Sequence, residues 1–283
     1  MIDIIFIILN YKSYKDTVQL CKEILDQQYE SFKIIVVDNA SPNESLAIIQ
    51  KELACNNSID ILESNTNGGY AKGNNIGLKY VERYNPRYVC VLNNDVHFTK
   101  YTIDQLIKIY PTLDRPAIVA PMQILPGEKK LEYKTLYSPT FFEDLLDLTP
   151  FTRKTVGYSD ILKNQIVDEV PGAFLFVDYS VFKKLGFFCE DTFLFCEERF
   201  LGKAAKEHGY KNYIINSLSY LHMHSATIGT TTTRKFQRLC YQRGVLAYTK
   251  RYRKLAFFKC ALLQLAFYAK EIKISIKETI KGK

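Results

Sequence analysis

The feature that most constrains the fold of this chain is a regular alternation of apolar runs with helical patterns between residues 4 and 120. The runs, rich in Ile, Val and Leu, cover residues 4–9, 33–37, 59–63, 88–92 and 118–120. Near-continuous apolar runs of this length are typical of strands that are buried on both faces of a sheet. Segments between them, such as residues 14–27, repeat their apolar side chains at helical spacing. The pattern predicts an α/β fold with a mostly parallel sheet flanked by helices.

The start of the second helix carries a signal of its own. Ser41 is placed to cap this helix, Pro42 to be its first residue and Glu44 its third. Such a capping box satisfies backbone N–H groups at a helix start, and proline costs little there because it has no N–H. We therefore expect a helix that begins at Pro42.

The second half of the chain is less regular. Residues 125–168 mix polar, aromatic and charged side chains, which predicts an irregular excursion from the sheet. The elements expected after it are a strand over 170–177, a helix over 192–208 closed by Gly209, and short strands over 213–215 and 219–222. Residues 254–273 combine Leu and Phe with Lys, which favours an amphipathic helix over a membrane span.

Bulk properties exclude several classes of protein. The apolar start has Asp3 in place of a basic flank and no small-residue cleavage site, so we interpret it as a buried strand and expect a cytoplasmic protein. The seven cysteines contain no C-x-x-C pair, which argues against a zinc site and a disulfide framework. The net charge is +8, but Lys and Arg are concentrated in residues 234–283 and no recognition module is present. A nucleic-acid-binding protein is therefore disfavoured.

Polar side chains follow each of the first four apolar runs. They are Asn10; Asp38 and Asn39; the glycine-rich segment 65–75 with Gly73 and Asn74; and Asn93, Asn94 and Asp95. In open α/β sheets, ligands bind beyond the carboxyl ends of the strands. The sequence therefore predicts a binding crevice lined by these four groups.

Five residues are candidates for the chemistry. Asp95 can hold a divalent cation that bridges two phosphates, or it can close a turn. Glu197 and Glu198 lie near a predicted helix start, where a carboxylate can act as a general base or form a solvated surface pair. His222 is a good metal ligand or a structural histidine, as is the neighbouring His224. By themselves these residues leave the alternatives open.

The order of these groups along the chain is more specific than any one of them. The residues that carry a resemblance are 8–11, 36–41, 67–77, 92–95, 171–174, 195–198 and His222. In this order they resemble glycosyltransferase family 2, and especially its bacterial rhamnosyltransferase-like branch of surface polysaccharide biosynthesis. The resemblance implies a Rossmann-like GT-A domain over residues 1–225. A basic amphipathic helical extension would follow over residues 226–283.

The resemblance also implies a role for each candidate. In the nucleotide-sugar site, Asn10 and Asp38 would line the pocket for the nucleotide base. The other residues of this site would be Asn39, Gly73, Asn74, Asn93 and Asn94. Asp95 and His222 would hold Mg²⁺ or Mn²⁺. Glu198 matches the position of the catalytic base, with Glu197 beside it.

Two departures from the family pattern matter. The usual aspartate-x-aspartate is Asn93-Asn94-Asp95 here, so the metal site has one carboxylate fewer. The usual Glu-Asp is Glu197-Glu198, so the choice of base between these two residues stays open.

The implied activity is the inverting transfer of rhamnose or a hexose from a dTDP- or UDP-linked donor to a glycan hydroxyl. The setting would be capsule, O-antigen or cell-wall polysaccharide synthesis, where acceptors are often lipid-linked. One alternative is a catalytically weak or non-catalytic sugar-nucleotide-binding relative, suggested by the reduced metal motif. Another is a sugar nucleotidyltransferase, but no Gly-rich loop with Arg and Lys adjoins the first strand.

The basic tail has two interpretations. Residues 234–283 suit peripheral contact with anionic lipid at the inner face of the cell membrane, because each basic residue near such a surface contributes on the order of 1 kcal/mol. Alternatively, the tail packs on the domain or on another subunit of an oligomer.

Overall fold

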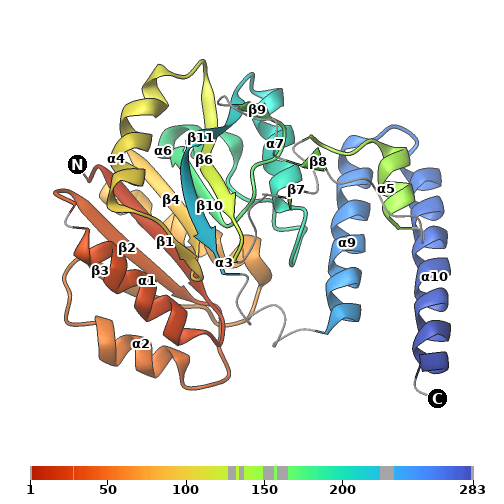
Figure 1. Ribbon diagram of the computed structural model, residues 1–283, viewed down its shortest axis with the longest axis horizontal. Helices are drawn as coiled ribbons and strands as arrows, with labels where there is room; N and C mark the ends of the chain where they lie inside the picture. Colours follow the sequence, from red (N-terminus) through yellow and green to blue (C-terminus); the bar gives the residue numbers. More distant parts are fainter. Residues whose placement is uncertain are drawn as a thin grey trace.

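The computed structural model of the chain describes residues 2–27, 29–126, 132–133, 137–148, 156–157, 165–223 and 233–281. Within these ranges, a large sheet lies between two layers of helices, and two long C-terminal helices stand beside one of the layers (Figure 1). His224, the predicted domain boundary at 225/226 and much of segment 125–168 lie outside the described residues.

The sheet confirms the expected α/β class. Its strands run in the order β3 (Ile59–Glu63), β2 (Phe32–Asp38), β1 (Ile4–Asn10), β4 (Tyr88–Asn93), β10 (Phe174–Asp178), β6 (Pro116–Ile124), β11 (Lys211–His222) and β5 (Val96–His97), with β9 (Gln165–Val167) paired to β11. The first four strands are parallel, and β11 is parallel to β6. Strand β10 is antiparallel to both of its neighbours and joins the two parallel groups.

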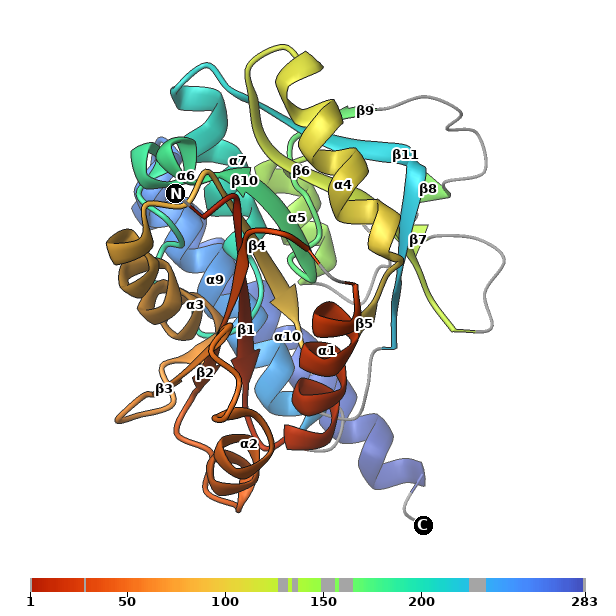
Figure 2. The ribbon, with the colours of Figure 1, turned by 90° about the vertical axis from the view of Figure 1, so that its left-hand side faces the viewer.

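Alternation within the apolar runs explains the two helical layers. In β1, Ile4, Phe6 and Ile8 face one buried cluster while Ile5 and Ile7 face the other. The first cluster is covered by α1 (Tyr14–Asp26), α2 (Ser45–Leu53) and α4 (Lys100–Ile109). The second is covered by α3 (Gly69–Tyr80), α6 (Tyr179–Leu185) and α7 (Glu197–Glu207). Figure 2 shows α3 and α4 on opposite sides of the sheet.

The predicted start of the second helix is wrong. Helix α2 begins at Ser45 rather than Pro42, and its cap residue Glu44 makes no side-chain capping bond. Ser41 is engaged elsewhere, since its hydroxyl accepts a hydrogen bond from the Lys12 backbone N–H and its own N–H donates to Asp38. The local capping signal was therefore overridden by contacts between the ends of two strands.

Three later elements also differ from their predicted bounds. Strand β10 begins at Phe174 rather than at residue 170, and α7 begins at Glu197 rather than at residue 192. Phe195 and Cys196 both have φ of +73°, a left-handed conformation that prevents the helix from starting earlier. The two short strands predicted over 213–215 and 219–222 form the single strand β11, which has a register shift between Ile215 and Ser219.

The C-terminal segment forms two helices, α9 (Arg234–Tyr252) and α10 (Ala256–Lys281). They pack with α5 (Phe141–Asp147) and the start of α7 around a third buried cluster that includes Cys196, Val245 and Leu263. None of the helices in the described ranges combines the length and the apolar character needed to cross a membrane. The remaining described elements are the 3₁₀ turns Val81–Tyr84 and Tyr110–Thr112 and the paired strands β7 (Glu132–Tyr133) and β8 (Val156–Gly157).

Candidate active site

The candidate residues gather at the carboxyl ends of the parallel strands. Strand β1 ends at Asn10, β2 at Asp38 and β4 at Asn93, and these neighbouring strands are in parallel register. Their polar ends therefore meet at one edge of the sheet, which is the position predicted from the sequence.

Asn10 and Asp38 form the centre of a buried hydrogen-bonded group. The Asn10 amide donates to Asp38 Oδ1 at 2.6 Å, and its Oδ1 accepts from the Thr17 hydroxyl at 2.8 Å. That hydroxyl in turn accepts from the Asn94 amide at 3.0 Å. The other Asp38 oxygen accepts from the backbone N–H of Ser41. The ends of β1, β2 and β4 are thus fixed to one another by side chains.

Asn39 holds the glycine-rich loop in place. Its amide donates to Asn67 Oδ1 and to the carbonyl of Gly69, and its Oδ1 accepts from the N–H of Gly68. Gly69 has φ of +81°, and a Cβ there would lie 2.1 Å from the carbonyl oxygen of Phe193. The loop therefore needs glycine to approach the segment that leads into α7.

Gly73 and Asn74 lie on α3, behind this loop. A Cβ on Gly73 would lie 2.5 Å from Leu9 Cδ1 and 3.3 Å from Asn39, so this glycine allows α3 to pack closely on β1. Asn74 is fully buried and its amide donates to the carbonyl of Tyr70. Its Oδ1 has no donor among the described residues.

Asn93, Asp95 and His222 form a second group at the end of β4. Asp95 Oδ1 lies 3.2 Å from His222 Nε2, and both side chains are about nine-tenths buried. The amide nitrogen of Asn93 lies 3.4 Å from the same ring nitrogen, and Gln123 contacts Nδ1 at 3.0 Å. The pairing of β5 with β11 brings His222 opposite Val96, one residue after Asp95.

Glu198 lies where α7 meets the loop before β10. Its Oε1 accepts from the backbone N–H of Gly172 at 3.1 Å, while the Gly172 carbonyl accepts from the Tyr70 hydroxyl at 2.5 Å. The next residue, Ala173, accepts a backbone hydrogen bond from Asn93. A short chain of contacts therefore connects Glu198 to the group that contains Asp95.

The two glutamates differ in their surroundings. Glu197 is 3% exposed, and burial together with the nearby Glu198 carboxylate raises its pKa to about 8. Glu198 is only partly buried, and its pKa is also raised by desolvation, against the opposing effect of the hydrogen bond from Gly172 and the charge of Arg199. Because two adjacent carboxylates do not readily ionise together, the more exposed Glu198 is the one expected to carry the charge near neutral pH.

The structure thus brings the predicted residues into three connected groups. Asn10, Asp38 and Asn94 form one, Asn93, Asp95 and His222 the second, and Glu197 with Glu198 the third, while Asn39, Gly73 and Asn74 support the loop between them. The sequence prediction missed Thr17 and Gln123, which link or orient members of these groups. Both contact residues on other elements, so no local sequence pattern marked them. Tyr70 lies in the segment 67–77 that carries the resemblance but was given no role, and its hydroxyl donates to the carbonyl of Gly172.

A cation would find two protein ligands at Asp95 and His222. Among the residues that the structure describes, no cluster of three or more His, Cys, Asp or Glu side chains could enclose a metal ion. The other ligands would have to be water or oxygens of a bound diphosphate. Mg²⁺ usually binds one or two carboxylates together with substrate phosphates, whereas an imidazole nitrogen is a common ligand of divalent transition metals.

Comparison with known proteins bears on the family of this chain. The family model described as glycosyl transferase family 2 matches residues 5–183. The low-salt glycan biosynthesis hexosyltransferase Agl10 of Haloferax volcanii is 29% identical over 212 residues, which cover 73% of this chain and 62% of the relative. The rhamnosyltransferase WbbL of Escherichia coli is 26% identical over 202 residues, covering 69% of this chain and 74% of the relative.

A solved structure supports the fold. The crystal structure of GalNAc-T7 with UDP, GalNAc and Mn²⁺ superposes with a TM-score of 0.65 at 9% identity, and covers 90% of this chain and 49% of that one. This likeness shows the GT-A fold. The family match spans more than half of the chain and includes every candidate residue from Asn10 to Asp95. The chain therefore belongs to glycosyl transferase family 2.

Proposed function

We propose that this chain is an inverting glycosyltransferase that moves rhamnose or a hexose from a nucleotide diphosphate to a hydroxyl of a glycan acceptor. The observation that carries the proposal is the meeting of three groups at one edge of the sheet. They are a buried Asn10–Asp38 pair, an Asp95–His222 pair, and the Glu198 carboxylate beside Gly172. The first group suits the nucleotide base, the second suits a metal-bound diphosphate and the third suits the acceptor hydroxyl.

The nucleotide would bind at the ends of β1 and β2. Asp38 offers a carboxylate that can accept from the imide N–H of a pyrimidine, and Asn10 lines the same pocket and orients this carboxylate through its amide. The buried Asn74 Oδ1 lacks a donor among the described residues, which favours a ligand group nearby. Asn39, Gly73, Asn93 and Asn94 complete this proposed nucleotide-sugar site.

The diphosphate would lie next to Asp95 and His222. One carboxylate oxygen and one imidazole nitrogen, 3.2 Å apart, fit Mn²⁺ or Mg²⁺ when phosphate oxygens supply further ligands. When bound, the ion would stabilise the negative charge of the departing diphosphate. Gln123 would fix the orientation of the His222 ring through Nδ1.

The acceptor would be activated by Glu198. This carboxylate is partly exposed and its raised pKa brings it closer to the working pH, which suits a general base. It would take the proton of the acceptor hydroxyl as the oxygen forms a bond to the anomeric carbon and the bond to the diphosphate breaks. A single displacement of this kind inverts the configuration. Glu197, with a pKa of about 8, would remain protonated beside it.

The names of the relatives support glycan synthesis as the setting, and they do not select a donor. Agl10 is named for low-salt glycan biosynthesis and WbbL as a rhamnosyltransferase, while GalNAc-T7 was solved with UDP and Mn²⁺. We propose capsule, O-antigen or cell-wall polysaccharide synthesis as the setting and a dTDP- or UDP-linked sugar as the donor. A non-catalytic sugar-nucleotide-binding relative is the second candidate, because Asn93-Asn94-Asp95 provides only one carboxylate.

A donor hydrolysis screen tests the activity. Purified protein with Mn²⁺ or Mg²⁺ would be offered UDP-, GDP- and dTDP-sugars, with and without glycan acceptors, and release of nucleotide diphosphate would be followed. Release from one donor, lost in Asp95→Ala and in Glu198→Gln, is the expected result. Tight nucleotide binding without release from any donor would favour the non-catalytic relative, and absence of both would overturn the proposal.

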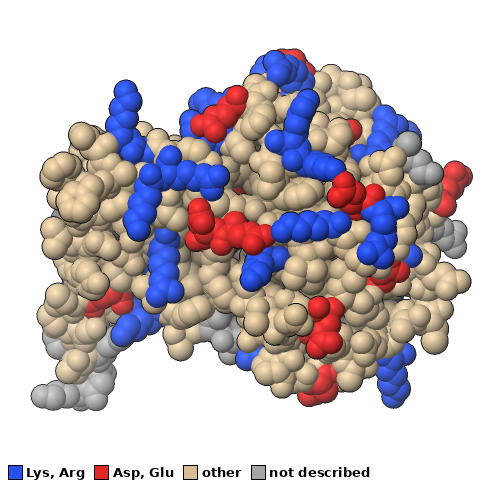
Figure 3. Space-filling model, turned by 180° about the vertical axis from the view of Figure 1, so that it is seen from behind, with Lys and Arg blue, Asp and Glu red and all other residues tan. Residues whose placement is uncertain are grey.

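We also propose that α10 contacts the cytoplasmic face of the membrane. Its outer side exposes large apolar residues, including Phe257, Phe258, Leu265 and Ile272, which are 61 to 81% exposed. The surface around the C-terminal helices also carries many Lys and Arg side chains (left part of Figure 3). Exposed apolar and basic side chains on one helix are typical of binding to anionic lipid, where lipid-linked acceptors would also be found.

Surface substitutions test this contact better than truncation, because α9 and α10 share a buried cluster with α7. Phe258→Glu together with Leu265→Glu would change only exposed positions. Flotation with vesicles that contain phosphatidylglycerol should fall for this variant, while vesicles of phosphatidylcholine alone should bind neither protein. Equal flotation of wild type and variant would exclude the membrane contact, and a loss of self-association instead would identify the face as a subunit interface.

A further inference from the structure

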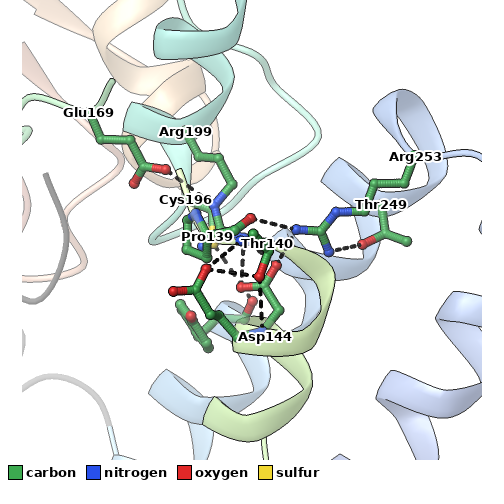
Figure 4. Close-up of polar contacts among 10 residues, drawn as sticks. Pro139, Thr140, Asp144, Glu169, Cys196, Arg199, Thr249 and Arg253 are labelled. Carbon is green, nitrogen blue, oxygen red and sulfur yellow. Dashed lines mark hydrogen bonds and ion pairs between the residues drawn. The ribbon is translucent and has the colours of Figure 1, made fainter. Parts of the chain in front are cut away.

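A buried cluster of charged side chains connects the C-terminal helices to the helix that carries Glu198. Asp144 of α5 is fully buried and both of its oxygens accept from Arg199 Nη1 at 3.0 Å. Arg253, at the end of α9, donates to the same carboxylate at 2.5 Å and to the carbonyl of Pro139 at 2.9 Å. Figure 4 shows the two arginines approaching Asp144 from opposite sides. Arg199 follows Glu198 directly in the sequence.

The same helices also meet by close backbone packing. A Cβ on Gly244 of α9 would lie 2.9 Å from Cys196 Sγ and 3.2 Å from the carbonyl oxygen of Phe195. The Cys196 thiol itself contacts the carbonyl of Tyr241 at 3.8 Å. Phe195 and Cys196 are the two residues with positive φ that precede α7. Helix α9 therefore covers the strained turn from which Glu197 and Glu198 project.

Two carboxyl groups and two guanidinium groups meet in this cluster. Asp144 and Glu169 face Arg199 and Arg253, and Arg199 Nε lies 3.5 Å from Glu169 Oε1. Burial raises the pKa of Glu169 to about 7. Tyr248 of α9 lies beside both guanidinium groups, with its ring centre 5.4 Å from Arg199 and 5.5 Å from Arg253. Separating the partners of such buried ion pairs is costly, because each charge would be left uncompensated, so the elements that carry them are held together.

From this geometry we infer that Arg253 is a positioning residue for the transfer reaction. It holds Asp144, Asp144 holds Arg199, and Arg199 fixes the first turn of α7 with Glu198 against Gly172. The C-terminal helices are then a structural part of the active site rather than an appendage. This inference rests on the proposed role of Glu198 in the reaction.

Arg253→Met tests the inference with little risk to folding. It removes the link from α9 but leaves Asp144 paired with Arg199, so no carboxylate is left buried without a cation. The matched control is Arg238→Met, which breaks another arginine–carboxylate pair of α9, with Glu271 of α10 rather than with Asp144 of α5. Arg253→Lys is the conservative variant, because it keeps the charge and loses the two-pronged contact.

Three measurements are needed: turnover of the donor, affinity for UDP and dTDP, and amide hydrogen exchange over residues 195–199. We expect Arg253→Met to lower kcat by about 10- to 100-fold, the effect of a displacement of roughly 1 Å, with nucleotide affinity unchanged. Exchange over residues 195–199 should become faster in this variant. Arg253→Lys should recover part of the turnover, and Arg238→Met should behave as wild type in all three measurements.

The outcomes separate the two proposals. If wild type turns over no donor, the proposed function fails, while hydrogen exchange in Arg253→Met still tests the positioning. If wild type is active and Arg253→Met keeps full turnover or unchanged protection over residues 195–199, the positioning role is refuted. Equal losses in Arg253→Met and Arg238→Met would also overturn it, because the effect would then be general destabilisation.

Discussion

Gly172 offers a direct test of how closely Glu198 must be placed. A Cβ at this position would lie 2.8 Å from Glu198 Oε1 and 3.6 Å from the Tyr70 hydroxyl. The φ of Gly172 lies outside the left-handed region, so alanine is compatible with the backbone. The Gly172 N–H that donates to Glu198 is also kept in Gly172→Ala. The substitution therefore acts mainly by pushing the carboxylate away.

The size of the effect follows from the distances. Ordinary contact begins at 3.4 Å, so the carboxylate must move by about 0.6 Å. A misplacement of roughly 1 Å can reduce the rate of a reaction about 100-fold, so we expect kcat to fall about 10-fold. Because the displaced atoms are the end of a flexible side chain, the free energy of unfolding should change by less than about 1 kcal/mol.

The assay follows release of nucleotide diphosphate at saturating donor, with UDP and dTDP affinity measured separately by calorimetry. A second variant, Glu198→Asp, shortens the side chain and makes room for the added methyl group. In that background Gly172→Ala should cause little further loss, as expected when two residues act through one contact.

Two results would refute this reasoning. If Gly172→Ala has normal turnover, the observed position of Glu198 is not the one that matters for the reaction. If the losses caused by Gly172→Ala and Glu198→Asp are independent, the methyl group acts on something other than this carboxylate.

Three further predictions test other parts of the site. Asp95→Ala removes one of two proposed cation ligands and should weaken Mn²⁺-dependent UDP binding at least about 10-fold, while UDP binding without metal should stay unchanged. Identical Mn²⁺ titrations of wild type and variant would contradict the role of Asp95 and His222. Asp38→Asn should weaken the free energy of UDP or dTDP binding, measured by calorimetry, by about 1–3 kcal/mol. Unchanged affinity would mean that the nucleotide base binds elsewhere. The pKa of Glu197 is raised from 4.5 to about 8 by burial, so this group favours the folded state most below pH 4.5 and loses that contribution as the pH rises to about 8. The free energy of unfolding of wild type should therefore fall between pH 5 and pH 8, and Glu197→Gln should reduce this fall by a few kcal/mol, since one pKa unit corresponds to about 1.4 kcal/mol. The measurement is urea unfolding at both pH values. The same pH dependence in both proteins would show that Glu197 does not cause the fall.

Much of the framework could be predicted from the sequence. The apolar runs identified β1, β2 and β4 within one or two residues, because a strand buried on both faces needs apolar side chains at nearly every position. The edge strand β3 was also located, although it is only partly buried and contains Asp60 and Glu63. Once these strands were parallel, their polar ends had to meet, which placed Asn10, Asp38 and Asn93 together. The functional roles of these residues remain predictions.

Local patterns failed where contacts from distant parts of the chain were stronger. The capping signal at Ser41 was lost because Asp38 and Lys12 took up its hydrogen bonds. The start of α7 was moved to Glu197 by two residues with positive φ, which helical periodicity does not reveal.

Only the tertiary structure decided what surrounds Glu198. Asp144 is 55 residues from Arg199 and 109 residues from Arg253 in the sequence, and each would be interpreted alone as a solvated charge. Their pairing depends on α5, α7 and α9 packing together around one buried cluster. The sequence determined the strands and the edge of the sheet at which the candidate residues meet, because periodicity is a local property. The placement of the charged side chains depended on long-range packing, which no local pattern records.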